Sequence, residues 1–202
     1  MSVSHYSRAA FVAVAAASLA GCGVNTVPTA EENAKAKWGD VQAAFQERAN
    51  LIPNLAEVVK ASGEQEKAIL TGVVEARAKA TSPQIQISAD DLTDPAKVAA
   101  FQAAQNQLSQ SLGGLGRLMA NVEAYPELKS IANYSTFMSQ LEGQENRIRV
   151  AIRDYNGAVQ NYNTTIRTFP SAIGAKIIYG AKPMVPYQAV TPGAEVAPKV
   201  DL

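Results

Sequence analysis

Apolar residues recur every three or four positions along most of this chain, a spacing that is typical of helix faces packed against one another. The spacing predicts four helices, which begin near Trp38, after Ser62-Gly63, at Pro95 and near Tyr134. The apolar face of the first helix has Trp38, Val41, Phe45, Ile52, Leu55 and Val59, and that of the second has Ile69, Val73, Ala76 and Ala80. The face of the third has Val98, Phe101, Leu108, Leu112, Leu115, Met119 and Val122. The face of the fourth has Tyr134, Met138, Leu141, Ile148, Ile152, Tyr155, Val159, Tyr162, Ile166 and Phe169. Residues 84–87 alternate like a strand, but so short a strand has nothing to pair with. We therefore expect an all-α fold, an antiparallel four-helix bundle of long helices with coiled-coil-like faces.

Prolines mark where these helices begin, bend and end. Thr93-Asp94-Pro95 offers a capping oxygen and then a proline at the first helical position, where no amide hydrogen is needed. Pro53 lies inside the first helix, which we expect it to kink or interrupt. Phe169-Pro170 is expected to close the fourth helix. A short extra helix over 171–179 would then cap the end of the bundle, and residues 181–202, rich in proline, are predicted to form a disordered tail.

The N-terminal segment looks like an export signal. A single strong positive charge, Arg8, precedes the apolar stretch 9–17, which is too short for a conventional membrane-spanning helix. Leu19-Ala20-Gly21-Cys22 resembles a bacterial lipobox, in which the signal is cut before the cysteine and the thiol is acylated. This predicts a signal peptide over 1–21, a lipidated tether over 22–30 and a helical domain over 31–180. An ordinary signal peptide and an uncleaved anchor are the alternatives. Gly23, where lipoproteins kept at the inner membrane have aspartate, favours the outer membrane facing the periplasm.

Composition restricts the chemistry that the mature chain could perform. Loss of residues 1–21 removes Arg8 from the 18 basic residues and none of the 18 acidic ones, which leaves a net charge of −1. This balance does not favour nucleic-acid binding. The only histidine, His5, lies in the signal, and the only cysteine, Cys22, would be acylated. Cys/His zinc sites and Ser-His or Cys-His nucleophiles are therefore not expected, nor is a cofactor. Residues 113–116, Gly-Gly-Leu-Gly, lie in a helical pattern and indicate close helix packing or local softening rather than a phosphate loop.

Four polar residues stand where the helix faces call for apolar ones. They are Arg48, Glu66, Gln105 and Glu145. Because a buried charge needs a partner, we expect Arg48 to pair with a carboxylate and Gln105 to bond amide or hydroxyl groups. Two interpretations stay open: a buried ion pair that fixes helix register, and a polar layer that binds a ligand or moves protons.

A tyrosine-asparagine pair occurs twice at a seven-residue interval, as Tyr155-Asn156 and Tyr162-Asn163. The repeat indicates stacked core aromatics with satisfied hydroxyl groups, or a surface that recognises a partner helix. Trp38 is similarly interpreted as a core anchor, with a place at the membrane interface as the alternative.

Several stretches, taken in order, resemble the LemA family of bacterial envelope proteins. They are Arg48-Ala49-Asn50-Leu51-Ile52-Pro53-Asn54-Leu55, Glu75-Ala76-Arg77-Ala78-Lys79-Ala80, Glu123-Ala124-Tyr125-Pro126-Glu127-Leu128-Lys129, Leu141-Glu142-Gly143-Gln144-Glu145-Asn146-Arg147-Ile148, Arg153-Asp154-Tyr155-Asn156, Tyr162-Asn163 and Phe169-Pro170-Ser171. The resemblance implies a membrane-attached helical bundle that faces away from the cytoplasm, with no enzymatic activity to carry over. Many members have a longer uncleaved apolar anchor, so the lipid anchor rests on Cys22 alone.

These observations predict a non-enzymatic envelope lipoprotein, an adaptor or scaffold that interacts with another, unidentified envelope protein. A periplasmic module that binds a small ligand or a peptide between its helices is the alternative. A third possibility is an enzyme that uses carboxylates such as Glu66 and Glu145.

Overall fold

The computed structural model describes residues 25–59, 64–120 and 134–188. Its elements are α2 (Thr26–Val59), α3 (Glu64–Ala80), the 3-10 helix η1 (Ala89–Thr93), α4 (Pro95–Ala120), α6 (Tyr134–Thr165) and α7 (Ser171–Ile177). Every regular element in this part of the chain is helical, which confirms the all-α class. The short helix expected over 171–179 is present as α7.

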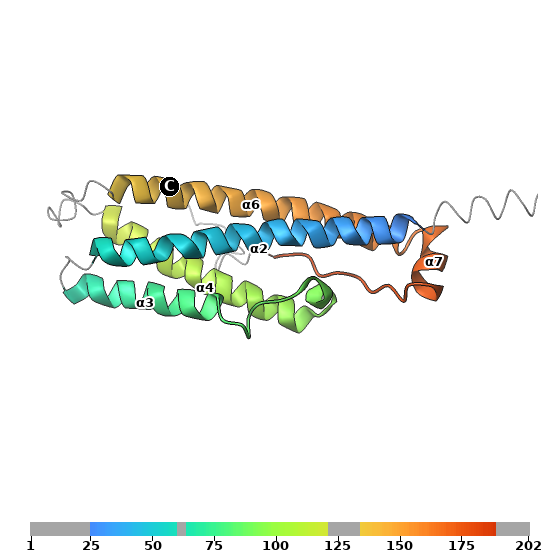
Figure 1. Ribbon diagram of the computed structural model, residues 1–202, viewed down its shortest axis with the longest axis horizontal. Coiled ribbons are helices and arrows are strands. Elements are labelled where there is room, and N and C mark those ends of the chain that lie inside the picture. Colours follow the sequence, from blue (N-terminus) through green and yellow to red (C-terminus); the bar gives the residue numbers. More distant parts are fainter. Residues whose placement is uncertain (1–24, 60–63, 121–133, 189–202) are drawn as a thin grey trace, which may run out of the picture.

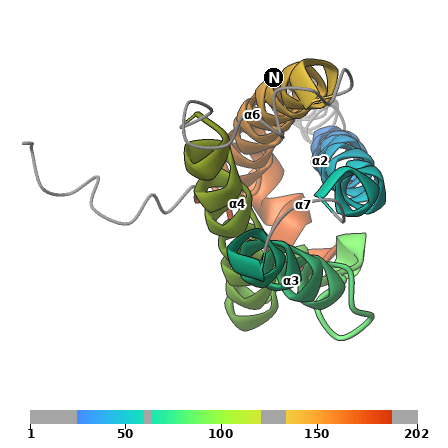
Figure 2. The same ribbon diagram turned by 90° about the vertical axis from the view of Figure 1, so that its left-hand side faces the viewer.

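The long helices lie along one axis, and their lengths are unequal (Figure 1). α2 packs along α6, α3 packs along α4, and α2 also contacts α3. Figure 2, which views the molecule from the end opposite α7, shows the four long helices around a common centre. At about 1.5 Å per residue, the 34 residues of α2 span about 51 Å, whereas the 17 residues of α3 span only about 25 Å. α3 therefore covers only part of the length of α2.

The core near α7 is built around aromatic rings, and we call this part the aromatic half. The Trp38 ring lies 5.3 Å from the Phe101 ring and 5.2 Å from the Tyr155 ring, between centroids. Phe45 lies 5.6 Å from Phe101 and 5.8 Å from Tyr187. Trp38 is only 1% exposed, which confirms its interpretation as a core anchor.

The core at the other end, the aliphatic half, consists of small and branched side chains. Its buried members are Ile52, Val73, Ala76, Ala80, Ala104, Leu108, Leu112 and Leu141. They come from α2, α3, α4 and α6, and most of them stand at positions that the three-and-four spacing predicts.

Two predicted features of the first helix are corrected. The tether expected over 22–30 is too long, because α2 already begins at Thr26 and buries Val27 and Ala30. Of the two effects expected of Pro53, a kink or an interruption, the interruption does not occur, because α2 continues through it to Val59. The start of α4 agrees with the prediction. Asp94 Oδ1 accepts hydrogen bonds from the backbone amides of Ala96 at 2.9 Å and Lys97 at 3.3 Å.

The C-terminal part of the apolar pattern departs from its prediction in two places. α6 ends at Thr165, and Phe169, expected on its buried face, is 82% exposed. The disordered tail expected from residue 181 is wrong for residues 181–188, which run extended beside the helices and bury Met184 and Tyr187 (Figure 1). We call residues 181–188 the strap. Residues 189–202, like the predicted signal peptide, lie outside the described residues.

Candidate functional site

Arg48 lies at the junction of the two halves and is fully buried. Its Nη1 donates to Glu145 Oε1 at 2.8 Å and to Ser109 Oγ at 2.7 Å. Its Nη2 donates to Gln105 Oε1 at 2.9 Å and more weakly to the Gln105 carbonyl at 3.4 Å. The guanidinium carbon also lies 5.1 Å from the centre of the Phe45 ring, within cation–π range. One cation therefore joins α2, α4 and α6.

The structure brings three of the four predicted seam residues together. Arg48 and Gln105 are buried, whereas the side chain of Glu145 is 40% exposed, so water reaches one end of the ion pair. Gln105 Nε2 also donates to the Ala80 carbonyl at 3.3 Å, which extends the layer to the last residue of α3. The expected carboxylate partner of Arg48 is thus Glu145. The fourth residue, Glu66, lies in α3, but its side chain is outside the described residues.

A second arginine completes the helix around Pro53. Because proline has no amide hydrogen, the Ala49 carbonyl, four residues earlier, loses its partner within the helix. Arg77 Nε of α3 donates to this carbonyl at 2.8 Å. The proline therefore creates an acceptor that ties α2 to α3 instead of breaking α2. Arg77 is not marked out by the apolar spacing, although a proline inside a helical pattern signals such an open carbonyl.

The repeated tyrosine-asparagine pairs of α6 hold the strap. Asn156 exchanges two hydrogen bonds with the backbone of Tyr187, at 2.8 and 2.9 Å, and Asn163 does the same with Met184. The Tyr155 hydroxyl donates to the Val185 carbonyl at 2.8 Å. The Tyr162 hydroxyl donates to the Lys182 carbonyl at 3.1 Å. Both hydroxyl groups are satisfied as expected, but their acceptors are on the strap.

The spacing of these pairs fits an extended peptide. Seven residues of helix rise about 10.5 Å, and three residues of extended chain span about 10 Å. Asparagines seven apart can therefore meet backbone groups three apart, and the tyrosines keep the same register. The other edge of the strap is also bonded. Val185 N donates to the Leu92 carbonyl of η1 at 2.9 Å, and Gln102 of α4 donates to the Pro186 carbonyl at 3.4 Å.

Burial changes the acidity of the tyrosines around the strap. It raises the pKa of Tyr187 to about 12 and also raises the pKa of Tyr155. Both phenols therefore stay neutral to a higher pH than an exposed tyrosine, and Tyr155 stays a hydrogen-bond donor. They act here as structural groups that fasten the strap.

An open pocket of about 470 Å³ adjoins the Arg48 layer in the aliphatic half. Its walls come from α4 and α6: Ser109, Leu112, Gly113, Leu141, Glu142, Glu145 and Arg149. The exposed part of Glu145 faces a mixed wall of leucines and charged groups there. A Cβ added at Gly113 would meet nothing within 4 Å, so of the two interpretations of these glycines, close helix packing and local softening, the first is wrong at this position.

The described part of the chain holds neither a metal-binding cluster nor a helix suited to crossing a membrane. No three His, Cys, Asp or Glu side chains gather there in a group that could hold a metal ion. Among the helices of the same part, none combines the length and the apolar character needed to cross a membrane. Cys22, the predicted lipidation site, lies outside the described residues.

Comparison with known proteins identifies the family. Residues 37–202 match the LemA family. The chain belongs to the LemA family. It is 28% identical over 160 residues to magnetosome protein MamQ 2 of Paramagnetospirillum magneticum strain AMB-1 and 28% identical over 157 residues to magnetosome protein MamQ of Magnetospirillum gryphiswaldense strain MSR-1. Each match covers 72% of this chain, but the chain spans only 58% of the length of these relatives.

The stretches that resemble LemA proteins supply the main polar contacts of the structure. The stretch over 48–55 holds both Arg48 and Pro53, and the stretch over 75–80 supplies Arg77. The later stretches supply Glu145 and the two tyrosine-asparagine pairs. In this LemA protein, the polar residues of these stretches therefore join helices and fasten the strap.

Proposed function

We propose that this protein is a membrane-anchored envelope lipoprotein that serves as a non-enzymatic adaptor or scaffold for other envelope proteins. Its membrane association is supported by its place in the LemA family and by the lipobox-like Leu19-Ala20-Gly21-Cys22. Two or three acyl chains on Cys22 would hold it stably, whereas one chain holds only marginally. Gly23 favours the outer membrane facing the periplasm over the inner membrane.

The observation that carries the scaffold proposal is the internal use of the buried polar layer. The two terminal nitrogens of Arg48, Nη1 and Nη2, donate to Glu145, Ser109 and Gln105, which lie on two other helices. Such a layer fixes the register of helices and makes the domain a rigid body. The reversal of direction between successive long helices in Figure 1 supports an antiparallel four-helix bundle as that body.

The lipid anchor is tested by changing Cys22→Ala and by blocking signal cleavage with globomycin. We expect an unprocessed or non-lipidated form with altered mobility, and release of any processed product from the membrane fraction. A matched Ser18→Ala change should leave processing unaltered. Unchanged mobility together with unchanged membrane association would contradict the lipoprotein assignment.

The adaptor role is tested by photo-crosslinking in intact cells. Val74 on α3 and Val150 on α6 are exposed apolar residues of the long helices, and each is replaced by a photoreactive amino acid. We expect mass spectrometry to find an envelope protein that crosslinks from one face and not from the other. Recovery of no envelope protein above background in several growth conditions would count against the proposal.

The pocket beside Glu145 supports a second candidate, a module that binds a small ligand. Its leucine wall and half-exposed carboxylate suit an organic cation with an apolar part. A thermal-shift screen of amphiphilic amines tests this. Binding should disappear in Glu145→Gln and in Gly113→Met, which would fill the pocket, and persist in the control Asn161→Ala on exposed α6 surface. Binding that ignores both pocket variants would rule the pocket out as the site.

A further inference from the structure

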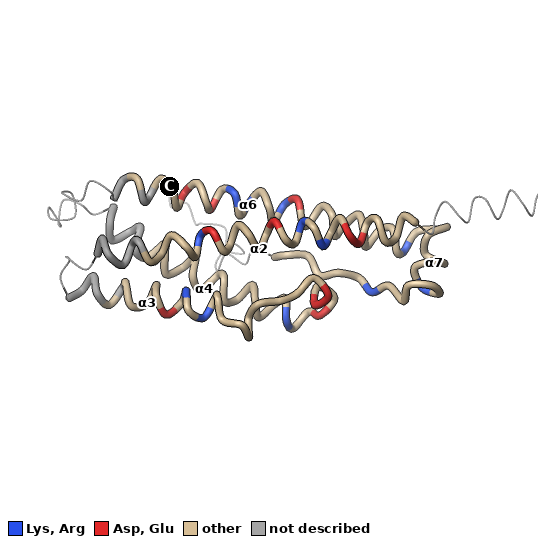
Figure 3. Tube along the Cα trace, in the orientation of Figure 1, with Lys and Arg blue, Asp and Glu red and all other residues tan. Residues whose placement is uncertain are grey.

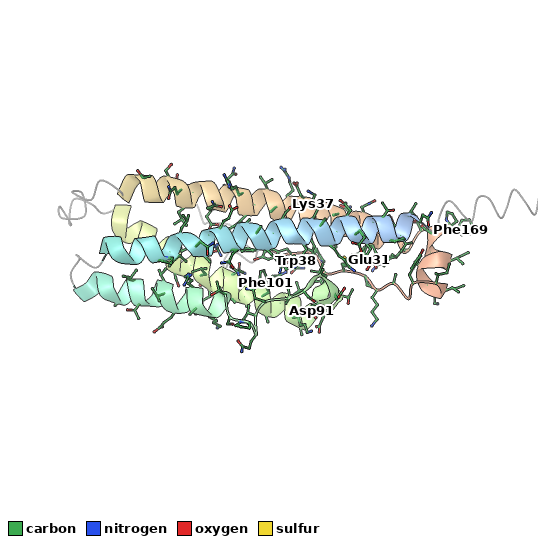
Figure 4. The ribbon with its side chains drawn as sticks, in the orientation of Figure 1. Glu31, Lys37, Trp38, Asp91, Phe101 and Phe169 are labelled. Carbon is green, nitrogen blue, oxygen red and sulfur yellow. The ribbon has the colours of Figure 1, made fainter. Side chains whose placement is uncertain are left out.

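The end of the molecule that carries α7 exposes large apolar side chains. Phe169 is 82% exposed, Ile177 76%, Ile178 61% and Ile173 55%. Ile173 and Ile177 lie one turn apart on α7 and share a face. Figure 4 shows Phe169 at the tip of this end, directed away from the long helices. Single exposed apolar residues are ordinary, but four within ten residues of sequence at one end of the molecule mark a contact surface.

The same end is basic. Arg167, Lys176 and Lys182 flank the apolar residues, and all three are exposed. The sequence has no acidic residue between Asp154 and Glu195. Figure 3 shows lysine and arginine on and around α7 with no acidic residue on that helix. The nearest acids of α2 are Glu31 and Glu32, and Lys35 pairs with both.

The tip also lies where the described chain begins. α2 starts at Thr26 beside α7, and Val27 and Ala175 belong to the same buried cluster (Figure 1). Cys22 precedes Thr26 by only four residues, a reach of at most about 14 Å. A lipid on Cys22 would therefore hold this end of the domain, and no other, at the bilayer surface.

We propose that Phe169, Ile173, Ile177 and Ile178, with Arg167, Lys176 and Lys182, form a docking surface for a bilayer that contains anionic lipids. This inference rests on the membrane anchoring proposed above and adds a second contact to it. The apolar side chains enter the boundary between headgroups and acyl chains, and the cations bind lipid phosphates. Docking turns a loose tether into a fixed attachment that stands the long axis of the domain away from the membrane.

The test uses the full-length lipidated chain in vesicles of phosphatidylcholine and phosphatidylglycerol whose acyl chains carry bromine, a quencher of tryptophan fluorescence. The probe is Ile177→Trp, and the matched control is Val74→Trp, an exposed position on α3, which does not reach the α7 end. Buried Trp38 gives the same background in both. We expect the brominated lipid to quench Ile177→Trp severalfold more than Val74→Trp. Equal quenching of the two would overturn the docking surface.

Charge is tested on the same probe. Adding Lys176→Gln and Lys182→Gln should reduce quenching in vesicles with phosphatidylglycerol and leave it unchanged in phosphatidylcholine alone. Raising the salt from about 0.1 M to about 1 M should act in the same way, because it shortens the screening length from about 10 Å to about 3 Å. If quenching of the Ile177→Trp probe does not decrease, the basic residues do not take part in docking.

Further outcomes separate the possible failures. A chain that does not remain with the vesicles shows that the anchor fails, whereas a retained chain with an unquenched probe shows that docking fails. Without lipid, the Ile177→Trp probe should be open to acrylamide, a quencher in water. If it is already shielded, protein covers the tip, either a second copy or the rest of this chain, and the bilayer is the wrong occupant.

Discussion

The aromatic half and the aliphatic half of this LemA protein close their cores in different ways. In the aliphatic half α3 packs along α4 and contacts α2, and small side chains such as Val73 and Ala76 fill the space between them. In the aromatic half α3 is absent, because it ends at Ala80, and the strap and η1 take its place. The strap also brings Met184 and Tyr187 into the core. A short third helix is thus compensated by an extended segment from the end of the chain.

The comparison teaches where polar side chains are needed. Helices satisfy most of their own backbone groups, so the aliphatic half is closed mainly by apolar contacts, with Arg77 bonding the Ala49 carbonyl that Pro53 frees. An extended segment cannot satisfy its own backbone groups, so the aromatic half needs Asn156, Asn163 and the tyrosine hydroxyls to bond the strap. Arg48 lies where the aliphatic half, closed by α3, meets the aromatic half, closed by the strap.

The largest loss of folding stability is expected when Arg48, at this junction, is replaced. Arg48→Ala leaves the buried Gln105 side chain without its donor and removes a large, fully buried side chain, so we expect the free energy of unfolding to fall by about 2–5 kcal/mol. Glu145→Gln should cost about 1 kcal/mol, because Glu145 is half exposed and keeps an acceptor. Urea denaturation of both single variants and the double variant measures the coupling. Losses of stability that add to within about 0.5 kcal/mol would show that Arg48 and Glu145 do not stabilise each other.

The next effect should be confined to the aromatic half. Asn163→Ala leaves two backbone groups of Met184 without partners, and we expect a loss of about 1–3 kcal/mol. Hydrogen exchange should speed up at the Met184 and Tyr187 amides and stay unchanged across Leu108 and Leu112. The exposed Asn161→Ala is the control, with a change within about 0.5 kcal/mol. Equal loss of protection in both halves would show that they do not differ as described.

Alkaline pH should also weaken the aromatic half. The pKa of Tyr187 is raised from 10.0 to about 12, so the folded state disfavours ionisation. The stability linked to this group is complete below pH 10 and is lost as the pH rises through about 12, because the unfolded phenol ionises first. Denaturation at about pH 9 to 11, a range that brackets the ordinary phenol pKa, measures how steeply the free energy of unfolding falls with pH. Tyr187→Phe should reduce this slope without abolishing it, because the pKa of Tyr155 is raised as well. An unchanged slope would assign the loss to other groups.

The smallest effect is a gain in the aliphatic half. Gly113 lies inside α4, and an added methyl group would meet nothing within 4 Å. Gly113→Ala should therefore raise the free energy of unfolding by about 0.5–1 kcal/mol, since alanine favours the helix. Thermal denaturation measures this gain, and a loss of stability instead would reveal a packing role for Gly113.

Local sequence patterns were enough to locate the helices and to show that certain side chains need partners. The three-and-four spacing located the buried faces, Asp94-Pro95 marked the start of α4, and Arg48 within an apolar face required a carboxylate. These features depend on short-range periodicity and on the cost of burying a charge, which are properties of the local sequence.

Which distant groups meet could be learned from the folded molecule alone. It selected Glu145 for Arg48, Arg77 for the carbonyl freed by Pro53, and the strap for the two tyrosine-asparagine pairs. It also placed Phe169 on the surface, although the apolar spacing predicted that Phe169 lies in the core. Helical periodicity says which face is buried but not what covers it. The cover depends on where α3 ends and where the chain returns, and the packing of the whole domain determines both.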